Sequence, residues 1–284
     1  MEDSFDAGSR IGAQLASPGL KAIIVFAPGI AINGSALVDG IVQRVGATVP
    51  ITGGLAGDGG AFARTWTLRS EGASSNEIVA IGLHGDALEF AHGSFGGWKP
   101  FGPARRVTRC NGNVVYEIDD EPALAVYQRF LGDHARDLPA SGLLFPFAIV
   151  DAMGNEIGPI RTILGVDRDA GSLTLAGAIN AGSYVKLMHA DTDRLVGGAT
   201  TAAEVARQER PVPGASLAVL VSCIGRKLVM GKRVGEEVAA VSRVLGQLST
   251  LTGFYSYGEI SPRLPNNVCG LHNQTMTISW LGEH

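Results

Sequence analysis

Hydrophobic and polar positions follow two different periods in the first part of the chain. Residues 4–15 and 34–45 place apolar side chains at helical spacing, and residues 21–27 form a short apolar run between them. This pattern predicts a helix, a buried strand and a second helix. After a glycine-rich loop at residues 53–60 the period becomes that of strands, which are expected at residues 64–70, 77–83 and 88–95 and in a hairpin at 106–118.

The second part of the chain returns to the same order of elements. Residues 119–122, Asp-Asp-Glu-Pro, predict a helix start, because acidic side chains favour the positive end of a helix and proline fits its first turn. Further helices are expected at residues 123–131, 193–209 and 235–245, and strands at 143–151, 159–166, 172–175, 184–188, 216–222, 252–257 and 275–280. The predicted fold class is mixed α/β (α+β), with two similar sandwich-like halves whose sheets are mixed and largely antiparallel. The halves are expected at residues 1–120 and 121–284.

Composition narrows the class of protein. The 284 residues are 45% hydrophobic and carry a net charge of −4, and no block of lysine or arginine interrupts the sequence. This balance argues against a nucleic-acid partner, which would require a basic face. Three cysteines without a CxxC pair indicate a reducing compartment, and short apolar runs with an acidic start predict neither a signal peptide nor membrane insertion. A cytoplasmic protein is expected.

Two resemblances to catalytic motifs fail on spacing or context. The segment 253–258 contains a serine between glycines, but its spacing is GxxSxG rather than that of a nucleophile elbow, and no clean helix start follows. Residues 183–186 match SxxK in a predicted strand, where residues three apart face opposite sides. The glycines at 53–60 lack the Lys-Ser/Thr of a phosphate loop, so they predict either a tight structural turn or a ligand-facing loop that involves Asp58.

Polar, aromatic and charged residues gather at the ends of apolar runs in the last quarter of the chain. Because strand ends hold side chains around crevices, this gathering predicts a ligand pocket. Arg226 could bind a carboxylate, and Glu259 could bind an ammonium group. The alternative is internal: Arg226 pairs with Glu259 or with Glu236, and the tyrosines fill a core. The expected ligand-binding residues are Cys223, Arg226, Tyr255, Tyr257, Glu259, His272, Asn273, Thr275 and Asp58.

His272 and Cys223 could also take part in haem binding and in catalysis, respectively. The six histidines form no HxxxH or HExxH pair, so no metal site is expected, but a single histidine can hold haem and His272 is the best placed by its neighbours. Cys223 could serve as a nucleophile if its thiol were acidic, and it would be structural if it were buried and unreactive.

The sequence resembles the FIST family of sensory domains. The segments that carry the C-terminal resemblance are 222–226 (SCIGR), 235–237 (GEE), 253–260 (GFYSYGEI) and 272–275 (HNQT), and those of the N-terminal half are 53–58 (GGLAGD), 96–98 (GGW), 107–108, 112–113 and 120–123 (DEPA). Together they span nearly the whole chain. The chain departs from the family in starting almost on its first helix, so the N-terminal half is expected to lack its first strand.

The resemblance implies a non-enzymatic sensory protein of bacterial signal transduction that binds a small ligand, such as an amino acid or small carboxylate. With no room for an output domain, it would act through a separate partner such as a kinase or a cyclic-dinucleotide enzyme. Two alternatives remain open: a haem-binding nitric oxide sensor, and a hydrolase-like enzyme that uses Cys223. No cofactor is expected under the first reading.

Overall fold

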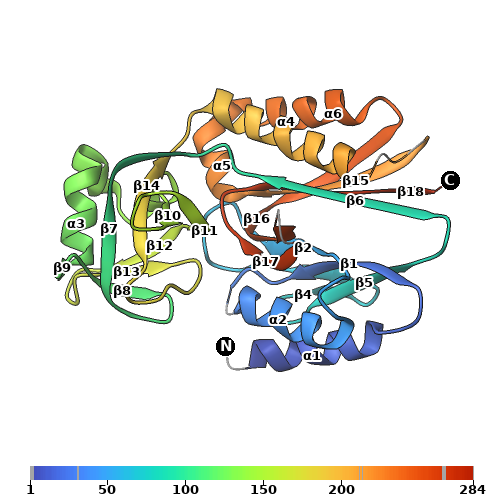
Figure 1. Ribbon diagram of the computed structural model, residues 1–284, viewed down its shortest axis with the longest axis horizontal. Helices are drawn as coiled ribbons and strands as arrows, with labels where there is room; N and C mark the ends of the chain where they lie inside the picture. The colour runs from blue at the N-terminus through green and yellow to red at the C-terminus, as the bar shows by residue number, and fades with distance from the viewer. Residues whose placement is uncertain (1–2, 31, 211, 213, 264–266, 284) are drawn as a thin grey trace. The chain divides into compact units, whose positions relative to one another are not determined.

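The computed structural model describes residues 3–30, 32–210, 212, 214–263 and 267–283 (Figure 1). Its helices are α1 (Asp3–Leu15), α2 (Gly34–Val45), α3 (Ala123–Leu131), α4 (Thr192–Glu209), α5 (Ile224–Met230) and α6 (Gly235–Leu245), with short 3₁₀ turns at Gly132–Asp137, Ala140–Leu143 and Gly231–Arg233. The expectation that a first strand is missing before α1 stays a prediction, and residues 1–2 lie outside the described ranges.

The strands fall into an early, a middle and a late group. The early strands are β1 (Leu20–Ala27), β2 (Ile51–Ala56), β3 (Thr67–Arg69), β4 (Gly72–Ser74), β5 (Val79–His84) and β6 (Leu88–Phe95). The middle strands are β7 (Lys99–Asn111), β8 (Val114–Ile118), β9 (Glu121–Pro122), β10 (Phe147–Val150), β11 (Glu156–Arg161), β12 (Ile163–Asp167), β13 (Ser172–Leu175) and β14 (Tyr184–His189). The late strands are β15 (Ser216–Cys223), β16 (Ser249–Arg263), β17 (Val268–His272) and β18 (Met276–Glu283).

The chain forms two compact units. Unit 1 contains residues 1–97 and 192–284, and unit 2 is the continuous segment 98–191. Each unit holds one large sheet whose described strand pairs are mostly antiparallel. The predicted fold class, mixed α/β with largely antiparallel sheets, is therefore confirmed.

The sheet of unit 1 is built from both ends of the sequence. Its strand order is β5-β1-β2-β16-β15-β18-β6, and β17 also pairs with β16. Only the pairs β1–β2 and β15–β16 are parallel among those described. The sheet folds over on itself, since Ser279 Oγ on β18 donates to Thr52 Oγ1 on β2 at 2.8 Å, although these strands are not neighbours in the strand order.

A helix pair covers each outer face of this folded sheet, α1 and α2 on one and α4 and α6 on the other (Figure 1). The α2 face packs Leu37, Val38 and Ile41 into a core with β1 and β2. The α4 and α6 face packs small alanines of α4 and Val241 of α6 against β15, β18 and β6. Both helix pairs therefore bury an apolar stripe on the sheet, which is the arrangement that the helical spacing predicts.

The same helix–strand arrangement occurs on both faces of the sheet. Helix α2 with the pair β1–β2 corresponds to α6 with the pair β15–β16, at positions 200 residues apart. Gly46 and Gly246 end α2 and α6 with nearly the same backbone angles, φ 88° and 91°, and donate to Val42 and Ser242 carbonyls. Gly53 and Gly253 then occupy matching positions in the parallel strand pairs: a Cβ on Gly53 would lie 2.0 Å from the Val25 oxygen, and one on Gly253 would lie 1.9 Å from the Leu220 oxygen. Any side chain at these glycines would collide with the neighbouring strand.

Unit 2 is an antiparallel sheet with one main helix. The order is β11-β10-β14-β7-β8-β13-β12, with β9 paired to β8, and every described pair is antiparallel. Helix α3 buries Tyr127 fully in a core of aliphatic and aromatic residues, and the Tyr127 hydroxyl donates to the Phe145 carbonyl at 2.8 Å.

Several predicted boundaries are wrong, each for a local reason. The predicted glycine loop 53–60 begins inside β2, because its first glycines permit the close approach of β1. The single strand predicted at 159–166 is two strands, β11 and β12, and the start of the strand predicted at 143–151 is a 3₁₀ turn. The strand predicted at 252–257 extends in both directions as β16, which pairs in turn with β15, β2 and β17.

Candidate functional site

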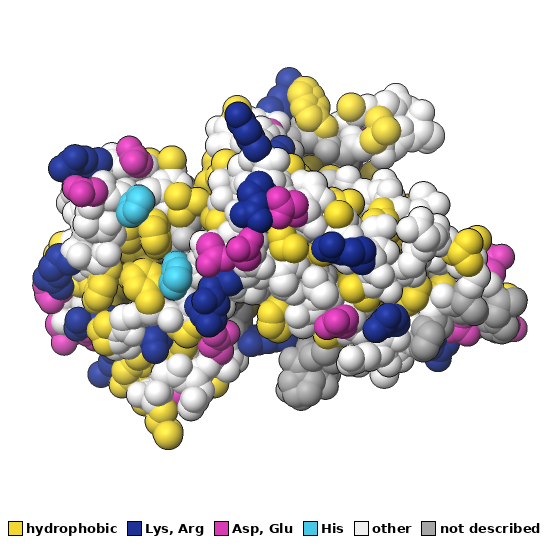
Figure 2. Space-filling view, turned by 90° about the horizontal axis from the view of Figure 1, so that it is seen from above, with side chains coloured by type: hydrophobic (Ala, Val, Ile, Leu, Met, Phe, Trp, Pro, Cys, Tyr) yellow, Lys and Arg dark blue, Asp and Glu magenta, His cyan; other side chains and the backbone are white. Residues whose placement is uncertain are grey.

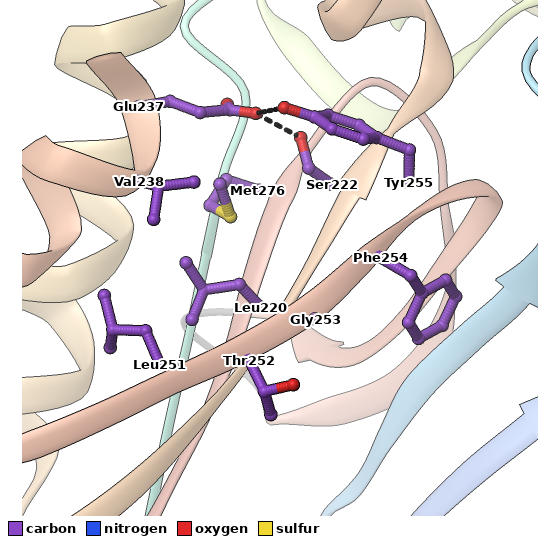
Figure 3. A pocket seen from close by; sticks show the side chains of 10 residues that line it. All are labelled: Leu220, Ser222, Glu237, Val238, Leu251, Thr252, Gly253, Phe254, Tyr255 and Met276. Carbon is purple, nitrogen blue, oxygen red and sulfur yellow. Dashed lines mark hydrogen bonds between the residues drawn. The ribbon is translucent and has the colours of Figure 1, made fainter. Parts of the chain in front are cut away.

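A cavity of about 250 Å³ lies between α6 and the sheet of unit 1 (Figure 3). On β16 the residues that face α6 alternate as Leu251, Gly253 and Tyr255, because successive side chains of a strand point to opposite faces. Gly253 has no side chain, so between these two neighbours the strand contributes only backbone to the lining. The lining residues are Leu220, Ser222, Glu237, Val238, Leu251, Thr252, Gly253, Phe254, Tyr255 and Met276. We call this the α6 cavity.

One end of the α6 cavity is polar. The Glu237 Oε1 atom accepts hydrogen bonds from Ser222 Oγ at 3.0 Å and from the Tyr255 hydroxyl at 2.8 Å (Figure 3). Glu237 is fully buried, although it is a carboxylate. Burial raises the pKa of Tyr255, and the charge of Glu237 raises it further, so the phenol keeps its proton and donates it.

Arg226 neutralises Glu237 from behind the cavity. Its Nε and Nη2 atoms lie 3.2 and 2.8 Å from Glu237 Oε2, and both side chains are 0% exposed. The same guanidinium donates to the carbonyl oxygen of Gly96 through Nη1 and to that of Leu195 through Nη2, the latter at 2.8 Å. All three nitrogens of Arg226 are thus engaged inside unit 1.

The partner of Arg226 differs from both partners named by the sequence. Glu236 lies one position before Glu237 on α6, and one residue of helix turns a side chain by about 100°. Glu236 therefore points outward and pairs with exposed Arg233, whose Nε lies 2.7 Å from Glu236 Oε1. Glu259 is held elsewhere, so the expected Arg226–Glu259 and Arg226–Glu236 pairs are wrong, and the pair is Arg226–Glu237.

Glu259 forms a second buried polar cluster in the sheet. Its carboxylate accepts a hydrogen bond from Ser256 Oγ, and Oε2 accepts from the Thr275 amide at 3.2 Å and from Thr275 Oγ1 at 3.0 Å. Burial raises the pKa of Glu259 to about 7, against the opposing effect of these hydrogen bonds and of Arg226. Asn273, in the loop before β18, is 1% exposed, and the described residues provide no hydrogen-bond partner for its amide group.

Asp58 and Tyr257 fix the loop that follows β2. The Asp58 carboxylate accepts from the backbone amides of residues 62, 63 and 64 at 2.8–2.9 Å and from the Tyr257 hydroxyl. These hydrogen bonds, the one from Tyr257 first, lower the pKa of Asp58. Tyr257 also stacks on Phe62 with ring centroids 4.3 Å apart. Asp58 therefore orders its own loop, and its role toward a ligand stays a prediction.

Tyr257→Phe should loosen this loop without unfolding the protein. The Tyr257 hydroxyl accepts from the Gly60 and Phe62 amides at 3.1 and 3.2 Å, and these bonds are lost with the oxygen. We expect a loss of about 1 kcal/mol in the free energy of unfolding, measured with urea. Amide exchange at Gly60 and Phe62 should accelerate, whereas the amides of β1 should be unchanged. Unchanged exchange at both loop amides would contradict this role.

Cys223 and His272 have internal surroundings. Cys223 ends β15 and is 3% exposed, and burial together with the charge of Glu259 raises its pKa, which disfavours a thiolate nucleophile. His272 Nε2 lies 2.9 Å from the Ser261 carbonyl oxygen and donates to it. In the described part of the chain, no group of three or more His, Cys, Asp or Glu side chains could hold a metal ion.

The structure brings together only some of the predicted site residues. Tyr255 lines the α6 cavity, Arg226 supports it, and Cys223, Glu259 and Thr275 belong to the second cluster. Sequence reasoning missed three residues that line the cavity, Ser222, Glu237 and Gly253. The acidic residue was visible at the start of α6, but its inward orientation depends on the phase of the helix, which a short window does not determine.

The N-terminal part of the chain matches the family model of the FIST N domain over residues 1–121, and the FIST C domain model matches residues 123–262. The chain belongs to the FIST family. FIST domains are associated with sensory signal transduction. The two domain models meet at residue 122, which lies within unit 2, so the family boundary and the compact units divide the chain differently.

Two individual proteins are similar to this FIST protein. "Uncharacterized protein MJ1623" from Methanocaldococcus jannaschii is 28% identical over 163 residues, and the match covers 52% of this chain and 31% of that relative. The chain thus spans about a third of the relative's length. A solved structure described as "Crystal structure of cyanuic acid hydrolase from A. caulinodans" aligns with 98% of this chain and 94% of its own, at 13% identity and a TM-score of 0.21. A structural similarity this weak supports no conclusion about the fold or function of this chain.

Surface charge and helix length add two findings. Basic and acidic side chains are intermixed on the face shown in Figure 2, in keeping with the net charge of −4. None of the helices that the structure describes has the length and hydropathy needed to cross a membrane.

Proposed function

We propose that this FIST protein is a small-molecule sensor whose ligand occupies the α6 cavity. One observation carries the proposal: a fully buried carboxylate, Glu237, closes the polar end of a cavity at the position where the first repeat places a fully buried leucine, Leu37. Positions 37 and 237 lie on the matching helices α2 and α6. The same helix–strand arrangement therefore has a packed apolar core in the first repeat and a cavity beside a charged side chain in the second.

The buried ion pair supports a functional reading. Removing two charges from water is expensive, and replacing a buried pair with apolar side chains is often neutral or stabilising by about 1–4 kcal/mol. The first repeat demonstrates that leucine suffices for packing at this position. The Arg226–Glu237 pair is therefore better explained by recognition than by stability.

Arg226 also provides a route for the signal. Gly96 and Leu195, whose carbonyl oxygens accept from Arg226, flank the segment 98–191 that forms unit 2. The two flanking stretches pack tightly, because a Cβ on Gly97 would lie 2.4 Å from the Arg194 oxygen. A ligand that shifts Glu237 would move Arg226 and hence both stretches. The readout belongs to a separate cytoplasmic partner, such as a bacterial kinase or cyclic-dinucleotide enzyme.

Blocking the cavity tests the proposal. A compound library is screened by thermal shift, and any ligand present at 100 times its Kd should stabilise the protein by about 2.7 kcal/mol. Val238→Phe fills the cavity from α6 and should abolish the shift. The matched control is Ala239→Phe, at the next, exposed position of the same helix, which should retain it.

Two outcomes would count against the proposal. A ligand that shifts the Val238→Phe variant as strongly as the wild type binds outside the α6 cavity. If no compound shifts folded wild-type protein, the sensor assignment itself loses its support.

A further inference from the structure

We infer that the ligand of the α6 cavity carries a hydrogen-bond donor, a hydroxyl or an amine, on a compact apolar body. This inference rests on the function proposed above. It differs from the small carboxylate that Arg226 was expected to bind, because Arg226 is paired with Glu237.

The positions of the protons determine the head group. Glu237 forms an ion pair with Arg226 at 2.8 Å, and the carboxylate of such a pair only accepts hydrogen bonds. The Ser222 and Tyr255 hydroxyls both give their single protons to Glu237 Oε1, at 3.0 and 2.8 Å. Each hydroxyl oxygen then has only lone pairs left to offer. The polar end of the cavity therefore presents only hydrogen-bond acceptors. A ligand group that binds there must donate a hydrogen bond.

A carboxylate or phosphate would be rejected at this polar end. Its oxygens would face the oxygens of Ser222, Tyr255 and Glu237 without an intervening proton, and like partial charges repel, most strongly beside the buried Ser222 and Glu237 side chains. Arg226 does not relieve this conflict, because its three nitrogens are engaged and the side chain is fully buried. Lys227 does not relieve it either: its Nζ lies 5.0 Å from the Tyr255 ring centroid, and Lys227 is not among the lining residues.

The rest of the lining determines the body of the ligand. Leu220, Val238, Leu251 and Met276 offer hydrocarbon and thioether surface around the cavity. A volume of about 250 Å³ exceeds the roughly 150 Å³ of an apolar protein cavity that holds one benzene ring. A single ring with a short polar arm fits this space, whereas a nucleotide does not.

A matched series of four one-ring compounds tests the inference by isothermal titration at pH 7. Benzyl alcohol and benzylamine carry a donor, benzoate carries only acceptors, and toluene has no head group. We expect the two donors to bind at least about tenfold more tightly than benzoate and than toluene, the ratio typical of one gained hydrogen bond. Tyr255→Phe should weaken benzyl alcohol several-fold and leave toluene unchanged, and Val238→Phe should exclude all four.

Each contrary result has a distinct meaning. Benzoate binding as tightly as the donors would overturn the inference. Equal binding of toluene and benzyl alcohol, lost in Val238→Phe, would also overturn it while leaving the cavity as a ligand site. Absence of binding by all four compounds to folded wild-type protein would overturn both the ligand class and the function on which it rests.

Discussion

Replacing Arg226 with methionine should lower the free energy of unfolding by about 3–5 kcal/mol, the loss typical when one member of a buried ion pair is removed. The substitution leaves the Glu237 carboxylate in a fully buried position with only two hydroxyl donors. It also deprives the Gly96 and Leu195 carbonyls of their donor. Urea unfolding at pH 7 measures the loss.

The first repeat supplies the compensating change. In the double variant Arg226→Met/Glu237→Leu both charges are absent, and position 237 carries the residue that position 37 has in the matching helix. We expect the double variant to regain most of the lost stability but not ligand binding. The control is Arg233→Met, which breaks the exposed pairs with Glu236 and Asp193 and should cost about 1 kcal/mol or less. A double variant as unstable as Arg226→Met would show that the carbonyl contacts of Arg226, rather than the ion pair, stabilise this region.

The stability of the protein should fall as the pH rises from about 4.5 to about 7 through the titration of Glu259. Its carboxyl has an ordinary pKa of 4.5 in the unfolded chain and a pKa of about 7 when buried in the folded sheet. Between these values the folded state retains a proton that the unfolded state has released. The contribution to stability is therefore fully present below pH 4.5 and lost above pH 7, and its size is about 3 kcal/mol.

Glu259→Gln isolates this contribution. Glutamine keeps an acceptor for Thr275 and cannot ionise, so the variant should be more stable than the wild type at pH 8 and should lack this part of the pH dependence. Urea midpoints at pH 5, 6, 7 and 8 provide the comparison, with exposed Glu236→Gln as the control. If wild type and Glu259→Gln differ by the same amount at all four pH values, Glu259 does not titrate in this range.

Hydrophobic periodicity predicts the elements of the fold because helices and strands bury one face each. The helices that cover the sheet, α1, α2, α4 and α6, were predicted within one or two residues. What periodicity does not contain is the partner of each strand. The pairing of β2 with β16 joins residues about 200 positions apart, and a local sequence pattern holds no information about a contact over that separation.

The candidate site was predicted in region but not in detail. Tyr255 and Arg226 were named because the sequence places them near the ends of apolar runs, and both belong to the α6 cavity or its support. Glu237 escaped because an acidic residue in a first helical turn is typical of an exposed position that favours the helix dipole. Gly253 escaped because a glycine offers no side-chain chemistry, and its need for close approach to β15 shows only in the folded sheet.

The continuity of unit 2 and the discontinuity of unit 1 have a consequence for synthesis on the ribosome. All strands of unit 2 lie between residues 98 and 191, so this unit can complete its sheet before the late strands exist. In unit 1 the early strands β1 and β2 must wait for β15, β16 and β18, and long-range pairing of this kind is slow and exposes strand edges in the interim. The nascent chain therefore passes through a stage in which a finished unit 2 follows an unfinished half of unit 1, and aggregation during expression should arise from that half.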